Sequence, residues 1–154
     1  MKFEIRQANT EDVATIAEFN FRMALETEGR ELDRPTLARG VETVLEDASK
    51  GVYYVTQAGD QVVGQLLLTY EWSDWRNGNF WWIQSVYVKP EYRRHGIFKS
   101  LYKHVEQLAR RRADVCGLRL YVEAHNARAQ RSYQQLGMKK TAYEMFEVDF
   151  VLRG

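Results

Sequence analysis

Several features that would point to particular classes of protein are scarce in this sequence. Cys116 is the only cysteine, so neither an intrachain disulfide nor a cysteine-based metal cluster can form, which fits a reducing compartment. No apolar run approaches the ~20 residues that a membrane-spanning helix needs. The charged N-terminal stretch MKFEIRQANTEDV also lacks the apolar core of a secretory signal. We therefore expect a cytoplasmic protein with no membrane partner.

An excess of either charge is missing as well. The chain has 22 Lys and Arg against 21 Asp and Glu, a formal net charge of +1. Nonspecific binding to nucleic acid depends on many unbalanced contacts with phosphates, so we expect no nucleic-acid partner and rank an RNA-binding role last. Any anion site must be local. The three histidines, His95, His104 and His125, share no metal-binding spacing, so we expect no metal site.

The size and composition are those of one globular domain. The chain has 154 residues, of which 45% are hydrophobic and 28% are charged. This length suits a single core and is short for two. No internal repeat, low-complexity tract or linker interrupts it, so we expect a single domain over residues 1–154.

The N-terminal half alternates between strand and helix patterns. A short strand at residues 3–6 precedes a helix that begins after Asn9 or Thr10 and runs to about Glu26. Pro35 suits the start of a second helix, which Gly51 stops. Runs rich in β-branched and aromatic residues then predict two hairpins, with strands at 52–56, 61–70 and 80–88 and a two-residue Asn77-Gly78 turn in the second hairpin.

The C-terminal half predicts a βαβ unit and a further helix. Apolar residues at helical spacing indicate a helix over residues 94–112, and Gly117 introduces a strand at 118–123. With the strand at 80–88 these form a parallel pair joined by a right-handed crossover. Asn126 caps a fourth helix that reaches Leu136, and a last strand or strand pair covers 143–152. The fold class is therefore α/β with a mixed sheet.

The start of the third helix is suited to binding an anion. The stretch YRRHGIFKSLYKHV, residues 92–105, places Arg93, Arg94 and Gly96 at a strand-to-helix junction. A helix N-terminus presents unpaired N–H groups and a positive dipole end, which makes residues 92–98 a candidate pyrophosphate cradle. The stretch matches neither the Walker A motif nor the dinucleotide fingerprint. The alternative is a pair of solvated arginines beside a turn glycine.

Two longer runs carry a resemblance to a known family. The run IQSVYVKPEYRRHGIFKSLY, followed by LRLYVEAHNARAQRSYQQLGMKK, resembles the acetyl-CoA-dependent N-acetyltransferases of the GNAT family in order and spacing. It is distantly like the polyamine acetyltransferases. The resemblance covers residues 52–141 most strongly and implies a GNAT-like acyl-CoA N-acyltransferase fold. Arg93, Gly96 and Phe98 occupy the fixed places of the signature Q/R-x-x-G-x-G/A, where Phe98 departs from the pattern.

The resemblance implies roles for particular residues. Acetyl-CoA is the expected cosubstrate, and Val86 and Val88 would pair with its pantetheine arm, with a strand N–H near Val86 polarising the thioester carbonyl. Asn126 and Tyr133 match the motif NxxAxxxYxxxGM, in which the tyrosine hydroxyl protonates the leaving sulfur; the alternative for Tyr133 is a core tyrosine. The expected pyrophosphate ligands are the backbone N–H groups of Arg94, His95, Gly96, Ile97, Phe98 and Lys99.

The general base is left open by the sequence. Gln84 stands where some polyamine acetyltransferases carry a carboxylate, and a neutral amide cannot abstract a proton. A two-residue Asn77-Gly78 turn would set Glu71 directly opposite Gln84 on the same face, which makes Glu71 the first candidate for base or amine anchor. Glu123 is the second candidate, and a water chain is the third. The alternative for Glu71 is a solvated hairpin charge.

The acceptor pocket is expected around Glu71. All four tryptophans lie within eleven residues there, and an aromatic face beside a carboxylate suits a cationic amine. We expect Trp72, Trp82 and Gln84 to contact the acceptor. Glu26 could stand with Glu28 and Glu31 at an acidic rim, but a solvated acidic turn is the favoured explanation for any one of these glutamates.

The predicted function is direct transfer of an acetyl group from acetyl-CoA to a primary amine, by a single N-acetyltransferase domain. A small cationic amine is the first choice of acceptor, and a protein N-terminus or lysine is the second. The alternative is a non-catalytic acyl-CoA sensor or interaction module with the same fold, which Phe98 and Gln84 would permit. The closing strand offers an edge for a homodimer.

Overall fold

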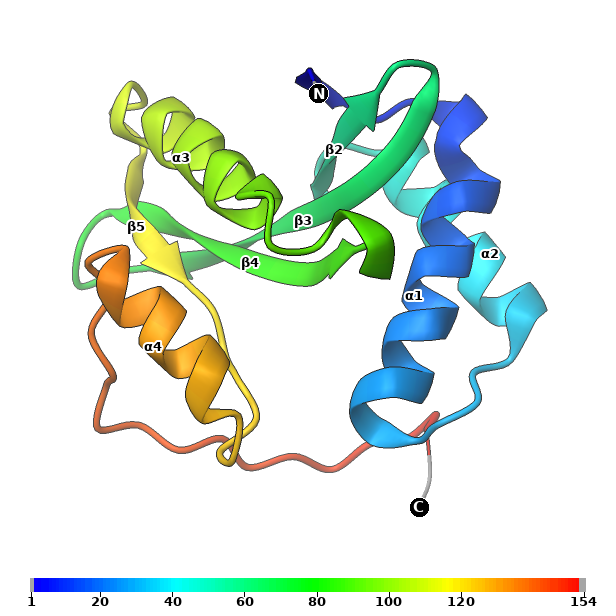
Figure 1. Cartoon of the computed structure of the whole chain (residues 1–154). Helices are drawn as coiled ribbons and strands as arrows, with labels where there is room; N and C mark the ends of the chain where they lie inside the picture. The colour runs from blue at the N-terminus through cyan, green and yellow to red at the C-terminus, as the bar shows by residue number, and fades with distance from the viewer. Residues whose placement is uncertain (1, 153–154) are drawn as a thin grey trace. The chain divides into compact units, whose positions relative to one another are not determined.

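A computed structural model describes residues 2–152 of the chain (Figure 1). The chain divides into two compact units, one ending at Leu120 and the other beginning at Tyr121, and each is described by itself. A single domain over the whole chain therefore stays a prediction. Within the described residues, no helix combines the length and the apolar character needed to cross a membrane.

The first unit is built on a five-stranded mixed sheet whose strands lie in chain order. The first four strands are antiparallel neighbours, and the last pair is parallel. This arrangement confirms the expected α/β class with a parallel βαβ unit. The strands are β1 (Phe3–Gln7), β2 (Val52–Ala58), β3 (Gln61–Ser73), β4 (Gly78–Val88) and β5 (Val115–Arg119).

The described residues form four α-helices, as expected, three in the first unit and one in the second. They are α1 (Val13–Glu28), α2 (Arg34–Glu46), α3 (Ile97–Arg110) and α4 (Ala127–Gln135), with short 3-10 turns η1 (Thr10–Asp12) and η2 (Pro90–Tyr92). The predicted cap at Asn9 is present, because its side chain accepts the Glu11 N–H while the Asp12 carboxylate accepts the Asn9 N–H. This capping box fixes where the first helical segment begins.

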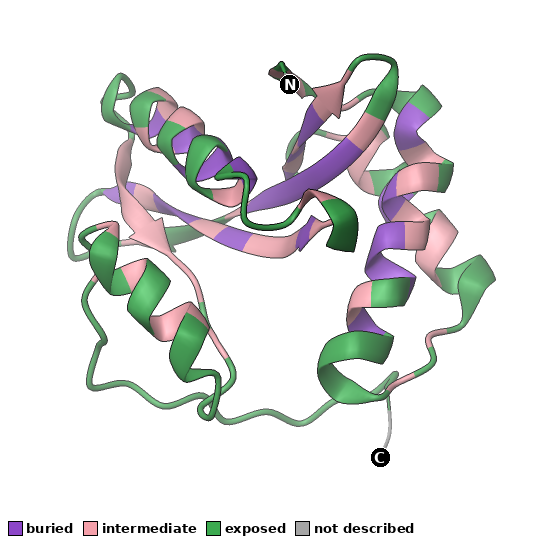
Figure 2. Cartoon of the chain, in the orientation of Figure 1, coloured by how far each residue is buried: buried purple, intermediate pink, exposed green. Residues whose placement is uncertain are grey.

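The helices of the first unit cover opposite faces of its sheet. On one face, Ile16 of α1 and Val41 of α2 form a core with Tyr53, Val55 and Leu67. On the other face, α3 packs so closely that a Cβ added to Gly64 would lie 2.9 Å from the Ile97 Cγ2. Figure 2 shows buried residues along β3 and β4 and on the inward sides of α1 and α3. This packing holds the α3 N-terminus beside the end of β4.

The predicted turn between β3 and β4 is wrong. Ser73 pairs with Gly78, so a four-residue loop joins the strands, and Glu71 lies opposite Phe80 while Gln84 lies opposite Leu67. Moving each strand by two residues leaves every side chain on the same face. The apolar alternation was therefore equally compatible with both registers, and Glu71 does not face Gln84.

Two further strand predictions need correction. β5 occupies Val115–Arg119 instead of 118–123, so Gly117 lies inside the strand and does not precede it. Glycine suits this position because an added Cβ would lie 2.7 Å from Cε1 of the Phe80 ring. No strand is formed at residues 143–152, within the part of the chain that is described. This segment exposes Tyr143 and Phe146 among its apolar residues. Alternating side chains favour a strand only where an edge is free to pair with it.

The second unit contains α4, and its ends follow the predicted signals. The Asn126 side chain accepts the Ala129 N–H at 3.1 Å, which caps the helix. Gly137 has a φ of 95° and ends it. The Gly137 and Met138 N–H groups donate to the carbonyl oxygens of Gln134 and Tyr133. Both helix boundaries therefore come from local chemistry that the sequence displays.

Candidate active site

The outer edge of β4 is open along half of its length. β5 pairs with β4 only from Asn79 to Trp82. In the described residues of this unit, the rest of the strand, Ile83 to Val88, pairs with β3 alone. An edge of this kind offers unpaired N–H and C=O groups to an extended chain that contains amides. Val86 and Val88 lie in this open stretch, as the predicted role in holding a pantetheine arm requires.

A β-bulge interrupts β4 beside the open edge. Gln65 pairs with Tyr87 and Leu67 pairs with Gln84, so Ser85 and Val86 together face one residue of β3. Ser85 has a φ of 50°, in the left-handed region that residues other than glycine rarely adopt. A bulge bends its strand and redirects the groups next to it. The chain therefore changes direction at Val86.

The junction after β4 forms an anion cradle from backbone groups. Arg94 and Gly96 have φ values of 68° and 74°, and α3 then begins at Ile97 with no side chain capping its N-terminus. Nothing lies within 4 Å of a Cβ added to Gly96. An uncapped helix start preceded by left-handed residues concentrates N–H donors and suits a pyrophosphate. The residues present thus fit the coenzyme that the sequence predicts.

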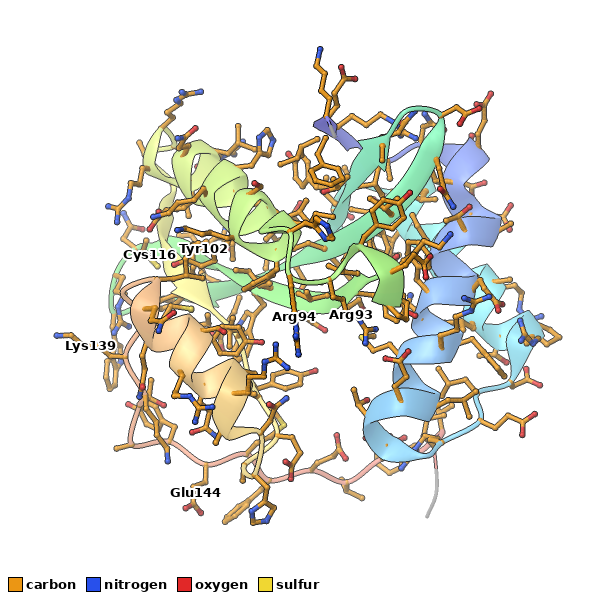
Figure 3. All side chains as sticks on the ribbon, viewed as in Figure 1. Arg93, Arg94, Tyr102, Cys116, Lys139 and Glu144 are labelled. Atoms are coloured by element: carbon orange, nitrogen blue, oxygen red, sulfur yellow. The ribbon has the colours of Figure 1, made fainter. Side chains whose placement is uncertain are left out.

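The Arg93 side chain takes a position that sequence reasoning missed. Its Nε donates to the Val88 carbonyl at 2.8 Å and its Nη2 to the Glu26 carboxylate at 2.9 Å. The Tyr87 hydroxyl donates to the same carboxylate at 3.3 Å, and burial, then Glu26, raise the Tyr87 pKa and keep it protonated. Arg93 therefore links the last turn of α1 to the end of β4 (Figure 3).

The other side chains of the cradle differ in exposure. His95 Nδ1 lies 3.0 Å from the carbonyl oxygens of Tyr92 and Arg93, so its ring folds back onto its own loop. Phe98 is half-buried, with its ring centroid 6.3 Å from that of Tyr102 along the helix. Its backbone is helical, with negative φ. A side chain at this position of the signature is therefore accommodated without backbone strain.

Glu71 is already engaged by two donors. Arg119 donates to its carboxylate at 2.7 Å and the Trp82 indole donates to the same oxygen at 3.1 Å. Leu66 of β3 faces the bulge, and Glu71 lies five positions further along the same strand, a span of about 17 Å. This geometry does not favour direct proton abstraction by Glu71 from an amine at Val86.

The remaining acceptor residues divide between the two faces of the sheet. Trp82 pairs with Thr69, and the Gln84 side chain donates to the Thr69 hydroxyl, so both lie on the α1 side. Trp72 lies on the opposite face, because it alternates with Glu71 along β3. Only Trp82 and Gln84 therefore share a face with Glu26, which lies on α1 and contacts Tyr87.

The residues expected in the second unit are considered within it. The Asn126 side chain is used in capping α4. Tyr133 is half-buried, and this burial raises the pKa of its hydroxyl. The Glu123 carboxylate accepts the His125 N–H at 2.7 Å. Tyr133 therefore has a hydroxyl that stays protonated at neutral pH.

Two buried polar residues were missed by sequence reasoning. Gln65 and Asn20 lie in the core of the first unit, bonded to each other at 2.8 Å. A glutamine inside the apolar run VVGQLLL was the available signal, since an amide is buried only where it has partners. Across residues 2–152, no three His, Cys, Asp or Glu side chains gather in a way that would hold a metal ion.

Known proteins share both the sequence pattern and the fold. The model of the acetyltransferase (GNAT) family matches residues 11–138. The thialysine N-epsilon-acetyltransferase of Bos taurus is 39% identical over 80 residues, 51% of this chain and 45% of that protein. The chain thus matches less than half the length of this curated relative.

Solved structures agree with this match. A possible acetyltransferase from Clostridium difficile 630 is 47% identical, with a TM-score of 0.90 over 99% of this chain and 100% of that one. A predicted acetyltransferase from Clostridium acetobutylicum, solved with acetyl-CoA, has a TM-score of 0.78 at 17% identity over 97% of each chain, which shows the fold alone. The family match covers the bulge, the cradle and Tyr133, and this chain belongs to the acetyltransferase (GNAT) family.

Proposed function

We propose that this protein transfers the acetyl group of acetyl-CoA directly to a primary amine. The observation that carries the proposal is the open edge of β4, which ends at an uncapped helix N-terminus. An extended amide-containing arm suits the edge, and a pyrophosphate suits the helix start. Coenzyme A contains both groups in one molecule. Family membership supports the same cosubstrate.

In this proposal the coenzyme is held mainly by backbone groups. The N–H groups from Arg94 to Lys99 bind the pyrophosphate, and Arg94 and Lys99 add positive charge at exposed positions. Val86 and Val88 pair with the pantetheine arm. Asn126 contributes by fixing the start of α4, the helix that carries Tyr133.

The chemistry needs three groups from the protein. Bound acetyl-CoA supplies the acetyl group as a thioester. The Val86 N–H donates to the thioester carbonyl oxygen, and the Tyr133 hydroxyl gives its proton to the departing sulfur. Gln84 is neutral and orients the amine, whose proton passes to water, with Glu123 as the alternative acceptor.

The acceptor we propose is a small cationic amine. Trp82 and Gln84 lie on the sheet face that α1 covers, and Glu26 belongs to α1. Together these residues offer an aromatic surface, an amide and a carboxylate. The similarity to a thialysine N-epsilon-acetyltransferase supports an amine at the end of a short chain. The cytoplasmic location stays a prediction. The homodimer also stays a prediction, but the closing strand expected to provide its edge is not formed in the described residues.

Calorimetric titration with acetyl-CoA and with CoA tests coenzyme binding first. We expect saturable binding to the native protein and several-fold weaker binding to Arg93→Ala. Glu26→Gln is the matched control, since it breaks the same ion pair but keeps the guanidinium. Equal weakening in both variants would assign Arg93 a purely structural role. No binding at high micromolar coenzyme would overturn the proposal.

Turnover separates the enzyme from a sensor with the same fold. With coenzyme binding established, we expect CoA release in the presence of small diamines and of lysine analogues with a free side-chain amine. A peptide bearing an acetylated N-terminus and one lysine is the comparison for a protein acceptor. Saturable coenzyme binding without CoA release from any amine would favour the sensor.

A further inference from the structure

A buried polar cluster lies directly beneath the bulge in β4. Gln65 of β3 is fully buried, and Asn20 of α1 and Tyr53 of β2 are almost so. All three belong to the first unit, as does the bulge residue Ser85. Burying amides is unfavourable unless they are hydrogen-bonded. The three side chains are linked by hydrogen bonds through their N–H and O–H groups, and the Gln65 Oε1 has no partner among the described residues.

Gln65 is the centre of this cluster. Its Nε2 donates to the Ser85 carbonyl at 2.9 Å and to the Asn20 Oδ1 at 2.8 Å. The Asn20 Nδ2 donates in turn to the Tyr53 hydroxyl at 3.1 Å. Burial raises the Tyr53 pKa, while hydrogen bonds with Asn20 and Ser85 act in the opposite direction. Both protons of the Gln65 amide are thus used, which fixes its orientation.

The conformation of Ser85 needs support of this kind. Its φ of 50° is unfavourable for a residue with a side chain. Such a conformation persists only where the surrounding structure determines it. The Gln65 amide donates to the Ser85 carbonyl at 2.9 Å. Ser85 is therefore held through its carbonyl by a group that lies in the core.

The hydrogen bond from Gln65 to the Ser85 carbonyl also affects the Val86 N–H, because both groups belong to one planar peptide. The Ser85 C=O and the Val86 N–H belong to the same trans peptide, so they point in opposite directions. Holding the carbonyl toward the core therefore directs the Val86 N–H away from it. A donor on the carbonyl also polarises the peptide and strengthens the N–H as a donor.

We propose that Gln65, seated by Asn20 and Tyr53, is a positioning residue that aims the Val86 N–H at the thioester carbonyl oxygen. This inference rests on the proposed acetyl transfer and adds to it a buried amide that never touches the coenzyme. Gln65 acts through the Ser85–Val86 peptide alone. Its effect falls on the acetyl group, while the pyrophosphate cradle is unaffected.

Gln65→Met tests the proposal, because methionine has a similar length and no N–H donor. We expect kcat to fall roughly ten- to a hundredfold, at or below the low end of the ~10²–10³-fold loss seen when an oxyanion donor is removed, because the Val86 N–H is misdirected and not deleted. CoA lacks the thioester carbonyl, so its affinity should stay at the native value. The preference for acetyl-CoA over CoA should be lost in calorimetric titrations.

A second readout requires no coenzyme. The NMR chemical shift of the Val86 amide in the free protein should move in Gln65→Met, because the hydrogen bond to the Ser85 carbonyl of the same peptide is lost. Thr56→Val is the matched control, because Thr56 is buried in β2 and pairs with Gly64 beside Gln65. Its hydroxyl finds no hydrogen-bond partner among the described residues. We expect native kinetics, a native coenzyme preference and a native Val86 amide chemical shift in this variant.

The outcomes separate this inference from the proposed function. A native protein that binds neither acetyl-CoA nor CoA would overturn the function. Native binding of both, with an unchanged acetyl-CoA preference and an unchanged Val86 amide chemical shift in Gln65→Met, would overturn the role of Gln65 alone. Where Gln65→Met does not fold, Tyr53→Phe removes only one hydroxyl and should shift the same two readouts in the same direction; an unchanged Tyr53→Phe would then contradict the proposal.

Discussion

Tyr133 tests the proton transfer at the scale of one residue. Burial raises the pKa of its hydroxyl, so the protonated form persists through neutral pH and beyond the usual tyrosine value of about 10. We expect Tyr133→Phe to lower kcat by about a hundredfold, at the low end for a lost general acid. Acetyl-CoA affinity, measured by calorimetry, should be retained.

The raised pKa of Tyr133 also predicts how turnover depends on pH. Because the Tyr133 pKa is raised, deprotonation of this hydroxyl should cause no loss of activity between about pH 7 and pH 9. CoA release measured with a thiol reagent across that range checks the expectation. Equal loss of binding and turnover in Tyr133→Phe would instead make the residue structural.

For Glu71 we predict almost no effect of substitution on turnover. Its carboxylate is held by Arg119 and Trp82, and the pair with Arg119 is partly exposed. We expect Glu71→Gln to leave kcat within about twofold of native and to cost at most about 1 kcal/mol of unfolding free energy. Steady-state rates and urea unfolding give both quantities. A tenfold loss of kcat would restore Glu71 as the base.

Helix caps could be predicted from the sequence, whereas contacts between residues distant in the sequence could not. Asn9 and Asn126 were predicted as caps, since a capping side chain bonds its own next turn. The Arg93 contact with Glu26 joins residues 67 positions apart. No local pattern records such a pairing.

At the scale of elements, the contact between β3 and α3 supports the cradle. A Cβ at position 64 would lie 2.9 Å from Ile97 Cγ2, and Ile97 is the buried first residue of α3. Gly64→Ala should therefore displace the first turn of α3. We expect a lower Tm by thermal unfolding and weaker acetyl-CoA binding by calorimetry.

The control for this substitution is another glycine. Gly40 lies inside α2, with nothing within 4 Å of an added Cβ. Gly40→Ala should stabilise the protein by about 0.5–1 kcal/mol, because alanine favours the helix and restricts the unfolded chain. Coenzyme affinity should not change. Unaltered binding in Gly64→Ala would show that the cradle tolerates movement of the helix.

Element types were predictable here, while strand register was not. Capping residues, glycines and side-chain spacing indicated the four helices and the βαβ unit. The β3–β4 register differed because shifting both strands by two residues preserves every face. Glu71 lost its place opposite Gln84 for that reason alone.

At the scale of the whole molecule, acid stability should depend on Asp12. This buried carboxylate accepts two hydrogen bonds from Arg6, at 2.8 and 2.9 Å, and the bond with Arg6 is the main cause that lowers its pKa. The folded pKa is lower than the unfolded value of about 3.9. The stabilisation is therefore present above that value and is lost as pH falls through the folded pKa.

Asp12→Asn checks this linkage. We expect a loss of about 1–3 kcal/mol in unfolding free energy at pH 7, which shrinks as pH falls below about 4. Urea unfolding at pH 7, 5 and 3 measures it, with the exposed Asp60→Asn as a comparison. A difference that stays constant across this range would contradict the assignment.

At this scale, the sequence did not identify which strands pair when they lie far apart in the chain. The alternation in residues 143–152 suggested a strand, and the structure forms none there within the described residues. Alternation reports a possible sheet face and does not identify a partner edge. The family resemblance implied a donating N–H near Val86, whereas the amides beneath the bulge were not predicted.

The order of the strands along the chain also affects the sequence in which they can pair during synthesis. β3 pairs with β2 and β4 pairs with β3, so this part of the sheet closes through short loops as soon as the chain is available. The parallel β4–β5 pair must wait for α3 to cross over. During synthesis, which proceeds from the N-terminus, the surface beside α1 is therefore expected to assemble before the coenzyme edge is complete.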